Sequence, residues 1–305
     1  MKQGVKHLDK TKITLEPAGR SASVFKDVND LLKSRELLFA LLGRELAGKY
    51  KGSVLGLGWT LVRPLIMLFI YAVVVGQFLG ASRSVEKFAI FIFVGLLFWN
   101  LLADSISSGS VSMTANGSLL KKVWFPREIL PLTSFAVATV HFLVQIIVLI
   151  LGFAVFNSWP SLGNLLYLIP ITLIVFPVAF GFSLIFSVLN VRFRDTQFIV
   201  DVGLLLLFWS SPILYPWTFA HQYLASLPFG NVLQQIYLLN PFGLITMAAQ
   251  QALWAPINSE SGEVYQFFDS PFSTRLWLSV LASWIFLYIA QRIFARLAGT
   301  VVVDL

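Results

Sequence analysis

Long runs of apolar residues limit what this chain can fold into more than any other feature of its sequence. Bilayer hydrocarbon offers no water to backbone polar groups, so a crossing segment is usually a helix of about 20 mostly apolar residues. The second of the candidate runs is short, and we expect its helix to continue into the Ser-rich stretch that follows. The sequence therefore predicts an all-α, polytopic membrane protein with six transmembrane helices. The six runs are Leu61–Leu79, Phe88–Ala103, Ile129–Phe156, Leu162–Leu189, Phe198–Tyr215 and Leu276–Ile293.

The composition agrees with this interpretation. Hydrophobic residues make up 57% of the chain and charged residues 12%, whereas charged residues are about 25% of a typical soluble protein. The chain contains no cysteine, which excludes disulfides, thiolate metal sites and cysteine nucleophiles.

The Lys and Arg residues are distributed unevenly between the predicted loops. With the N-terminus inside, only Arg83, Lys87 and Arg275 of the 22 Lys and Arg residues face outward. Because positive residues gather in cytoplasmic loops, we expect both termini to be cytoplasmic. The net charge of +7 is then a signal of topology, and no nucleic-acid partner is expected. Residues 1–33 are polar and lack an apolar core, which predicts a cytoplasmic tail ahead of a transmembrane domain at 34–305.

The segment before the first span has the pattern of a helix lying in the headgroup plane. Four leucines share one face at helical spacing, while the basic residues of the segment stay polar and Glu45 precedes Lys49 by four residues. An ordinary juxtamembrane segment remains the alternative. The leucines are Leu38, Leu41, Leu42 and Leu46, and the basic residues are Arg44, Lys49 and Lys51.

A short amphipathic helix is also predicted in the loop between the second and third spans. Leu119, Leu120, Val123 and Trp124 fall on one face and two lysines on the other. We expect Ser118 to be the N-cap of this helix and Pro126 to end it. The result is an apolar face offered to a partner, and the alternative is a turn resting on lipid.

Polar residues occur in or beside the spans at two places. His141 and Gln145 lie four residues apart in the third span, and we interpret them as an interhelical hydrogen-bonding pair. In the turn before the fifth span we expect Arg192, Arg194 and Asp195 to form a local ion-pair cluster; a proton relay would need acids deeper in the membrane.

Between Pro212 and Pro271 the chain has no Lys or Arg, and its apolar pieces Val232–Leu239 and Phe242–Trp254 are too short to cross. Asn240 and Pro241 separate them. Two short helices dipping into the outer leaflet fit this pattern, provided that protein or a water-filled cavity covers their ends.

The sequence contains no G-x-x-x-x-G-K-[ST] motif, nucleophile elbow or metal-binding helix motif. A chain without a nucleotide site but with a helix that presents an apolar face is typical of a transport subunit driven by another protein.

Several motifs carry a resemblance to a known family. The segments RELAGKYKGSVLGLGWTLVRPL, KKVWFPREILPL, VRFRDTQ, WSSPILYP and LNPFG resemble the membrane subunit of type 2 ATP-binding-cassette polysaccharide exporters, which export O-antigen, teichoic acid and related polymers. The resemblance runs from about Lys33 to the C-terminus.

The resemblance implies a homodimer in the bacterial cytoplasmic membrane, with two separate cytoplasmic ATPase subunits that bind ATP and Mg²⁺; no cofactor is expected in this chain. It implies that Glu36–Lys51 is an interface helix at the gate, with Arg44, Glu45, Lys49, Tyr50 and Lys51 as its site residues, and that the two short outer helices are re-entrant. The first and fifth spans would line the path. The implied coupling helix to the ATPase consists of Ser118, Leu119, Leu120, Lys121, Lys122, Val123, Trp124 and Phe125.

A polymer path needs surfaces on which sugars slide, and aromatic rings supply them because sugar C–H faces pack on rings without a fixed register. On the first and fifth spans these candidates are Phe69, Tyr71, Phe208, Trp209 and Tyr215. The alternative for each is a lipid-facing or interfacial role.

We therefore expect a permease subunit that moves a lipid-linked polysaccharide, on a polyprenyl-pyrophosphate carrier, to the outer face of the membrane. One alternative is export of a small hydrophobic compound. Another is a membrane transferase acting on the lipid-linked sugar, for which only His141, Asp104 and Asp201 are available as catalytic groups.

The predicted topology can be tested with single cysteines in this cysteine-free chain. A membrane-impermeant thiol reagent added outside should label Ser261→Cys, in the predicted external loop Ser259–Glu263, and should leave Lys121→Cys unlabelled. The reverse labelling would show that the orientation is inverted.

Overall fold

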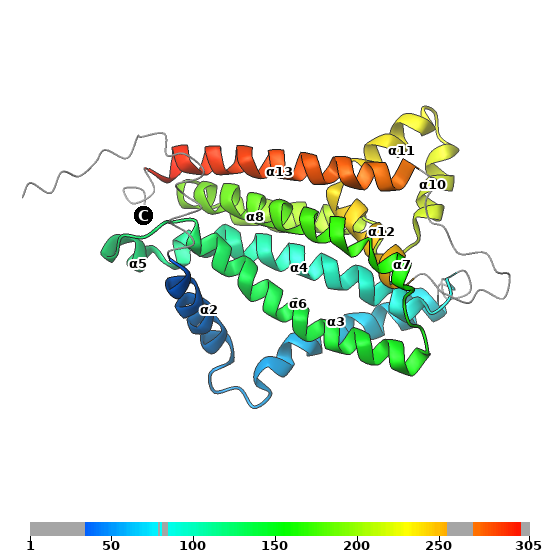
Figure 1. The fold of residues 1–305 in the computed structure, drawn as a ribbon, viewed down its shortest axis with the longest axis horizontal. Coiled ribbons are helices and arrows are strands. Elements are labelled where there is room, and N and C mark those ends of the chain that lie inside the picture. The colour runs from blue at the N-terminus through cyan, green and yellow to red at the C-terminus, as the bar shows by residue number, and fades with distance from the viewer. Residues whose placement is uncertain (1–33, 79, 81–84, 255–270, 300–305) are drawn as a thin grey trace, which may run out of the picture.

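The computed structural model describes residues 34–78, 80, 85–254 and 271–299, and the part of the chain it describes contains helices and no strand (Figure 1). The predicted tail at 1–33 and the predicted external loop lie outside the described residues. With the labels of Figure 1, the elements are α2 (Arg35–Tyr50), η1 (Gly56–Gly58), α3 (Trp59–Tyr71), the π-helical η2 (Ala72–Phe78), α4 (Phe88–Ala115), α5 (Gly117–Lys122), α6 (Ile129–Phe156), α7 (Leu162–Leu165), α8 (Leu168–Arg192), α9 (Thr196–Trp209), α10 (Trp217–Ala225), α11 (Gly230–Leu238), α12 (Pro241–Leu253) and α13 (Pro271–Ala298).

Within the described residues, five helical segments are long and apolar enough to cross a membrane. The second continues to Ala115, which confirms that the Ser-rich stretch extends it. They are Trp59–Phe78, Phe88–Ala115, Ile129–Phe156, Leu162–Arg192 and Ser273–Ala298.

The predicted fifth span, Phe198–Tyr215, is shorter in the structure. Helix α9 has 14 residues and ends at Trp209, so it is about 21 Å long, less than the roughly 30 Å of bilayer hydrocarbon. The chain then turns at Ser210–Pro216 before α10. A sixth span is reached only if α11 and α12 count as one, and these two helices are bent by 81° relative to each other.

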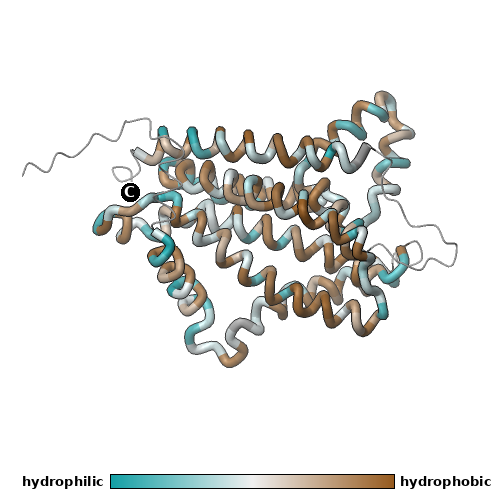
Figure 2. The backbone as a smooth tube through the Cα atoms, viewed as in Figure 1, coloured by the Kyte–Doolittle hydropathy of each residue, from teal (hydrophilic) through white to brown (hydrophobic). Residues whose placement is uncertain are grey.

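Helix α4 is the centre of the bundle. It packs on α6 and α8, while α13 packs on α8, and the four helices run side by side (Figure 1). In α4, 72% of the apolar span is buried inside the chain, against 17% in α6 and in α13. The apolar residues that line the outer helices (Figure 2) therefore face lipid or another protein chain.

Small residues bring α4 and α8 close together. A Cβ on Gly109 would lie 2.5 Å from the Cβ of Ser183 and 3.2 Å from its Cα. The Ser183 hydroxyl donates a hydrogen bond to the Ser105 carbonyl at 2.9 Å. This seam is the small-residue packing that membrane helices use when lipid supplies no hydrophobic driving force between them.

A second group of buried residues lies at the end of the bundle that carries α5. We call it the end cluster; it joins α2, the end of α4, α5, the start of α6, and α8 and α13 in their C-terminal halves. Its buried members are Leu41, Met113, Leu120, Phe125, Ile129, Leu130, Phe180, Leu184, Val188, Val191, Phe294 and Ala298.

The α4–α8 seam predicts different responses to the same substitution at two glycines. Gly109→Ala should lower the free energy of unfolding by about 1–3 kcal/mol, because the added methyl group overpacks the seam. Gly152→Ala in α6 is the matched control, since nothing lies within 4 Å of the added Cβ; it should be neutral or stabilising by about 0.5–1 kcal/mol. Unfolding in detergent measures both, and equal shifts would contradict the close approach.

Candidate functional site

The loop between α4 and α6 holds a helix shorter than expected. Helix α5 begins at Gly117 after Asn116, whose carbonyl accepts hydrogen bonds from the N–H groups of Leu119 and Leu120 at 3.0 and 3.1 Å. Ser118 is exposed and lies inside the helix, so the prediction that it is the N-cap is wrong. Proline disfavours helical conformation in the residue before it, and the helix ends at Lys122, four residues before Pro126.

The predicted apolar face of this segment is divided between the protein interior and the surface. Leu120 and Phe125 are buried in the end cluster at 8% and 7% exposure. Val123 has extended backbone, with φ −130° and ψ 137°, and is 51% exposed, while Trp124 is 89% exposed. Lys121 and Lys122 are also exposed. Leu120 and Phe125 therefore fix the loop to the bundle, and the Trp124 ring between them is exposed on its surface.

Helix α2 lies at the same end of the bundle as α5 and packs on α6 (Figure 1). Leu41 is buried in the end cluster, with Leu37 and Leu38 packed against it. Burial raises the pKa of the Glu45 carboxyl, against the opposing effect of Lys49 and then Arg44. Lys49 and Lys51 are exposed.

Two polar contacts join α2 to the bundle. The Arg44 guanidinium donates to the side-chain oxygen of Asn116, at the junction of α4 and α5. At the other end of the helix, the Tyr50 hydroxyl and His141 Nε2 share a hydrogen bond at 3.0 Å. Burial, and then the nearby charge of Asp104, raise the pKa of the Tyr50 hydroxyl.

The interhelical role expected for His141 and Gln145 is confirmed, with a different partner for each. His141 bonds to α2 through Tyr50, whereas Gln145 accepts a hydrogen bond from the Asn100 amide of α4 at 3.5 Å. The ion-pair cluster expected at the turn before α9 is wrong: Arg192, Arg194 and Asp195 are all exposed, and no ion pair joins these three described residues.

Most of the aromatic residues proposed for the path meet where α3 approaches the end of α9. The rings of Tyr71 and Phe208 stack with centroids 6.3 Å apart, and Phe208 contacts Trp209 edge-on at 5.6 Å. The Tyr215 hydroxyl donates to the Trp209 carbonyl at 2.9 Å. Phe69 is 69% exposed on α3, and among the described ring contacts it has none.

The sequence analysis missed two aromatic members of this group. Trp99 of α4 contacts Phe208 at 5.4 Å, and the Tyr237 hydroxyl of α11 lies 3.2 Å from that of Tyr215. Trp99 lies in a continuous apolar run and Tyr237 in a short one, so neither had a distinguishing local signal.

The turn after α9 is held by α12, which joins two of the short motifs found in the sequence. Asn240 donates to the Ser211 hydroxyl at 3.1 Å and accepts from the Phe242 N–H at 3.0 Å. Gln250 donates to the Pro212 carbonyl at 3.0 Å, and both Ser211 and Gln250 are buried. A buried Gln in an apolar helix is the signal that could have suggested such a contact, because buried polar groups are nearly always hydrogen-bonded.

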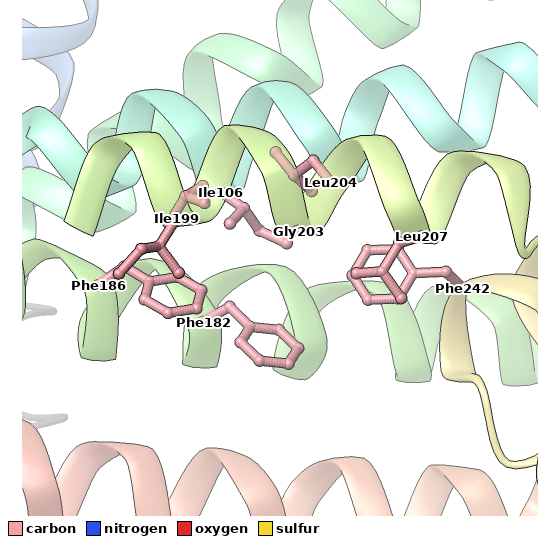
Figure 3. A pocket seen from close by; sticks show the side chains of 9 residues that line it. Ile106, Phe182, Phe186, Ile199, Gly203, Leu204, Leu207 and Phe242 are labelled. Atoms are coloured by element: carbon pink, nitrogen blue, oxygen red, sulfur yellow. The ribbon is translucent and has the colours of Figure 1, made fainter. Parts of the chain in front are cut away.

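An apolar cavity of about 160 Å³ lies between α4, α8, α9 and α12 (Figure 3). None of its lining side chains has a group for orienting a polar ligand or for acid–base chemistry. Among the described residues, no three His, Cys, Asp or Glu side chains gather as a metal-binding group. The cavity is lined by Ile106, Phe182, Phe186, Ile199, Val200, Gly203, Leu204, Leu207 and Phe242.

Comparison with known proteins gives consistent results. Residues 36–254 match the family model described as ABC-2 type transporter. The chain is 34% identical over 182 residues to the O-antigen export system permease protein RfbA of Klebsiella pneumoniae, covering 59% of this chain and 69% of that protein. It is 33% identical over 190 residues to the protein of the same name from Myxococcus xanthus, covering 62% and 72%.

Because Phe125 is buried and Trp124 is exposed, we predict a large loss of stability at one of these adjacent residues and a small one at the other. Phe125→Ala should lower the free energy of unfolding by about 3–5 kcal/mol, because it empties a buried aromatic site. Trp124→Ala should change it by no more than about 0.5 kcal/mol, as expected for an exposed side chain. Thermal unfolding of the purified chain compares them, and a large loss with Trp124→Ala would show that this ring is packed against the chain.

Proposed function

The chain belongs to the ABC-2 type transporter family, and from this premise we propose that it is the permease subunit of an ATP-driven exporter of O-antigen. In this proposal the cargo is a lipid-linked polysaccharide, carried on a polyprenyl pyrophosphate and moved from the cytoplasm to the outer face of the inner membrane. The exposed α5 loop is the observation that supports a driven transporter most directly.

This loop is the docking site for the ATPase. Trp124 is presented to solvent by a segment whose neighbours Leu120 and Phe125 are anchored in the end cluster. Trp residues are enriched among those that dominate binding at interfaces. Because the sequence has no P-loop motif, ATP and Mg²⁺ are bound by separate cytoplasmic ABC ATPase subunits, one for each copy of the permease. Both termini are then cytoplasmic, together with α5.

A second copy of the chain completes the path. One face of α9 is apolar and exposed at helical spacing, and it continues to the aromatic group at its end. Two such faces, with α3 of each copy beside them, form a passage bordered by Tyr71, Phe208, Trp209 and Tyr215. The exposed face of α9 consists of Phe198, Ile199, Val202, Leu205, Leu206 and Trp209.

The remaining short helices shape the two mouths of the path. Helices α11 and α12, bent by 81°, are re-entrant at the outer side, where Asn240 and Gln250 fix them to the turn after α9. Helix α2 lies at the inner mouth near the headgroup plane, where the exposed Lys49 and Lys51 face anionic lipid and the pyrophosphate of the carrier.

Export of a small hydrophobic compound is the second candidate, and the apolar cavity is the observation that favours it. Its volume of about 160 Å³ is below the roughly 300–1,000 Å³ of sites that enclose drug-sized ligands. The similarity to proteins named O-antigen export permeases supports polysaccharide export over this second candidate.

The docking role of the loop can be tested with two neighbouring substitutions. Trp124→Ala should weaken association with the ATPase subunit by about 2 kcal/mol or more if the ring is a hot spot, and polymer export should fall with it. Lys122→Ala is the matched control and should cost much less. Complex recovery and export are measured at matched expression. A loop that rests on lipid gives the opposite order, because the cation matters there and the ring does not affect assembly.

A further inference from the structure

Asn116 is the point at which α2, α4 and α5 meet. Its side-chain amide donates to the Ser112 carbonyl of α4 at 2.9 Å, and its backbone carbonyl accepts the first hydrogen bonds of α5. Its remaining side-chain acceptor takes the hydrogen bond from Arg44 of α2. Asn116 is buried; the contacts with Ser112 and Arg44 restrict its side chain, and the hydrogen bonds of α5 hold its backbone. A displacement of α5 at this junction therefore moves the oxygen to which Arg44 donates its hydrogen bond.

The same two helices also contribute to one group of buried residues. Leu41 of α2 and Leu120 of α5 are both buried members of the end cluster. Among the described residues, no member of this cluster comes from α3 or α9. The connection between α2 and α5 is thus separate from the two helices that border the proposed path.

The other end of α2 leads to the first span through a short turn that contains glycines. Gly52 and Gly56 have positive φ angles of 79° and 50°, a conformation that glycine adopts without strain. Between α2 and α3 the chain has only the short turn 51–58, which includes η1. Because this connection is short, a displacement of α2 is passed on to the start of α3.

We propose that Arg44 is a positioning residue, whose contact with Asn116 makes α2 and α5 move as one unit and so transmits the displacement of α5 to the first span. The inference rests on the proposed function, since it takes the ATPase as the source of that displacement. Arginine suits the role because its planar guanidinium has several donors in a fixed arrangement. Arg44 is itself exposed, and its hydrogen bond to the buried Asn116 is partly buried. In this proposal the role of the contact between Arg44 and Asn116 is to keep α2 and α5 in a fixed relative position.

The first test measures polymer exported per ATP hydrolysed by the complete complex. Arg44→Met should retain ATPase binding and ATP turnover, while the export ratio falls at least about five-fold, the lower end of typical coupling effects. Asn116→Asp keeps the acceptor for Arg44 but loses the amide that donates to Ser112, and its export ratio should exceed that of Arg44→Met. Arg35→Met is the matched control, because Arg35 is an exposed arginine of the same helix; it should leave the ratio unchanged.

The second test follows the helices themselves and does not depend on how the variants fold. Spin labels are attached to cysteine pairs in the complex, with Gly48→Cys in α2, Ser118→Cys in α5 and Gly152→Cys in α6. An added Cβ meets nothing within 4 Å at Gly48 or Gly152, and Ser118 is exposed. Between the nucleotide-free and ATP-trapped states, the 48–118 distance should stay constant while the 48–152 and 118–152 distances change together.

The outcomes separate this inference from the function on which it rests. Failure of the ATPase subunit to bind the native chain, or export that needs no ATP, would overturn the proposed function. Coupled export with a wild-type ratio in Arg44→Met, or a 48–118 distance that changes as much as the 118–152 distance, would overturn the inference alone.

Discussion

The close approach of α4 and α8 at Gly109 and Ser183 is the contact on which the rest of the structure depends. Lipid gives these helices no hydrophobic reason to associate, so their contact relies on small side chains and the Ser183 hydrogen bond. The contact makes α4 the buried centre, against which α6 and α12 also pack. Helix α4 continues past this contact to Ala115, and Asn116 then starts α5.

The described residues form two groups of buried side chains, and each holds a different set of helices together. The main core surrounds α4 and includes the turn after α9, which Asn240 and Gln250 hold from α12. The end cluster holds α2 and α5 together with the ends of α8 and α13. In the proposed exporter, the end cluster receives the motion of the ATPase and the aromatic group at the end of α9 borders the polymer. Helix α3 connects the end cluster to the aromatic group, because it follows the short turn after α2 and carries Tyr71.

The long spans could be predicted from the sequence because hydropathy is a local property, and α3, α4, α6, α8 and α13 all lie in the expected runs. The end of α9 could not, because the turn at Ser211 and Pro212 is held by side chains of α12, about 30 to 40 residues away in the sequence. Helical spacing grouped Leu120 with Trp124, but the early end of α5 places one inside and the other outside. Arg44 and Asn116 are 72 residues apart in the sequence, and no local sequence pattern indicates their contact.

The central claim, that this permease moves a lipid-linked glycan with energy from a separate ATPase, is tested most directly in sealed, inverted membrane vesicles that contain both subunits. The vesicles are supplied with lipid-linked O-antigen, and a glycosidase that cannot enter is added after transport. The account predicts that the polymer becomes protected only when ATP and the ATPase subunit are both present. Protection without either of them, or polymer that stays fully accessible while ATP is hydrolysed, would contradict it.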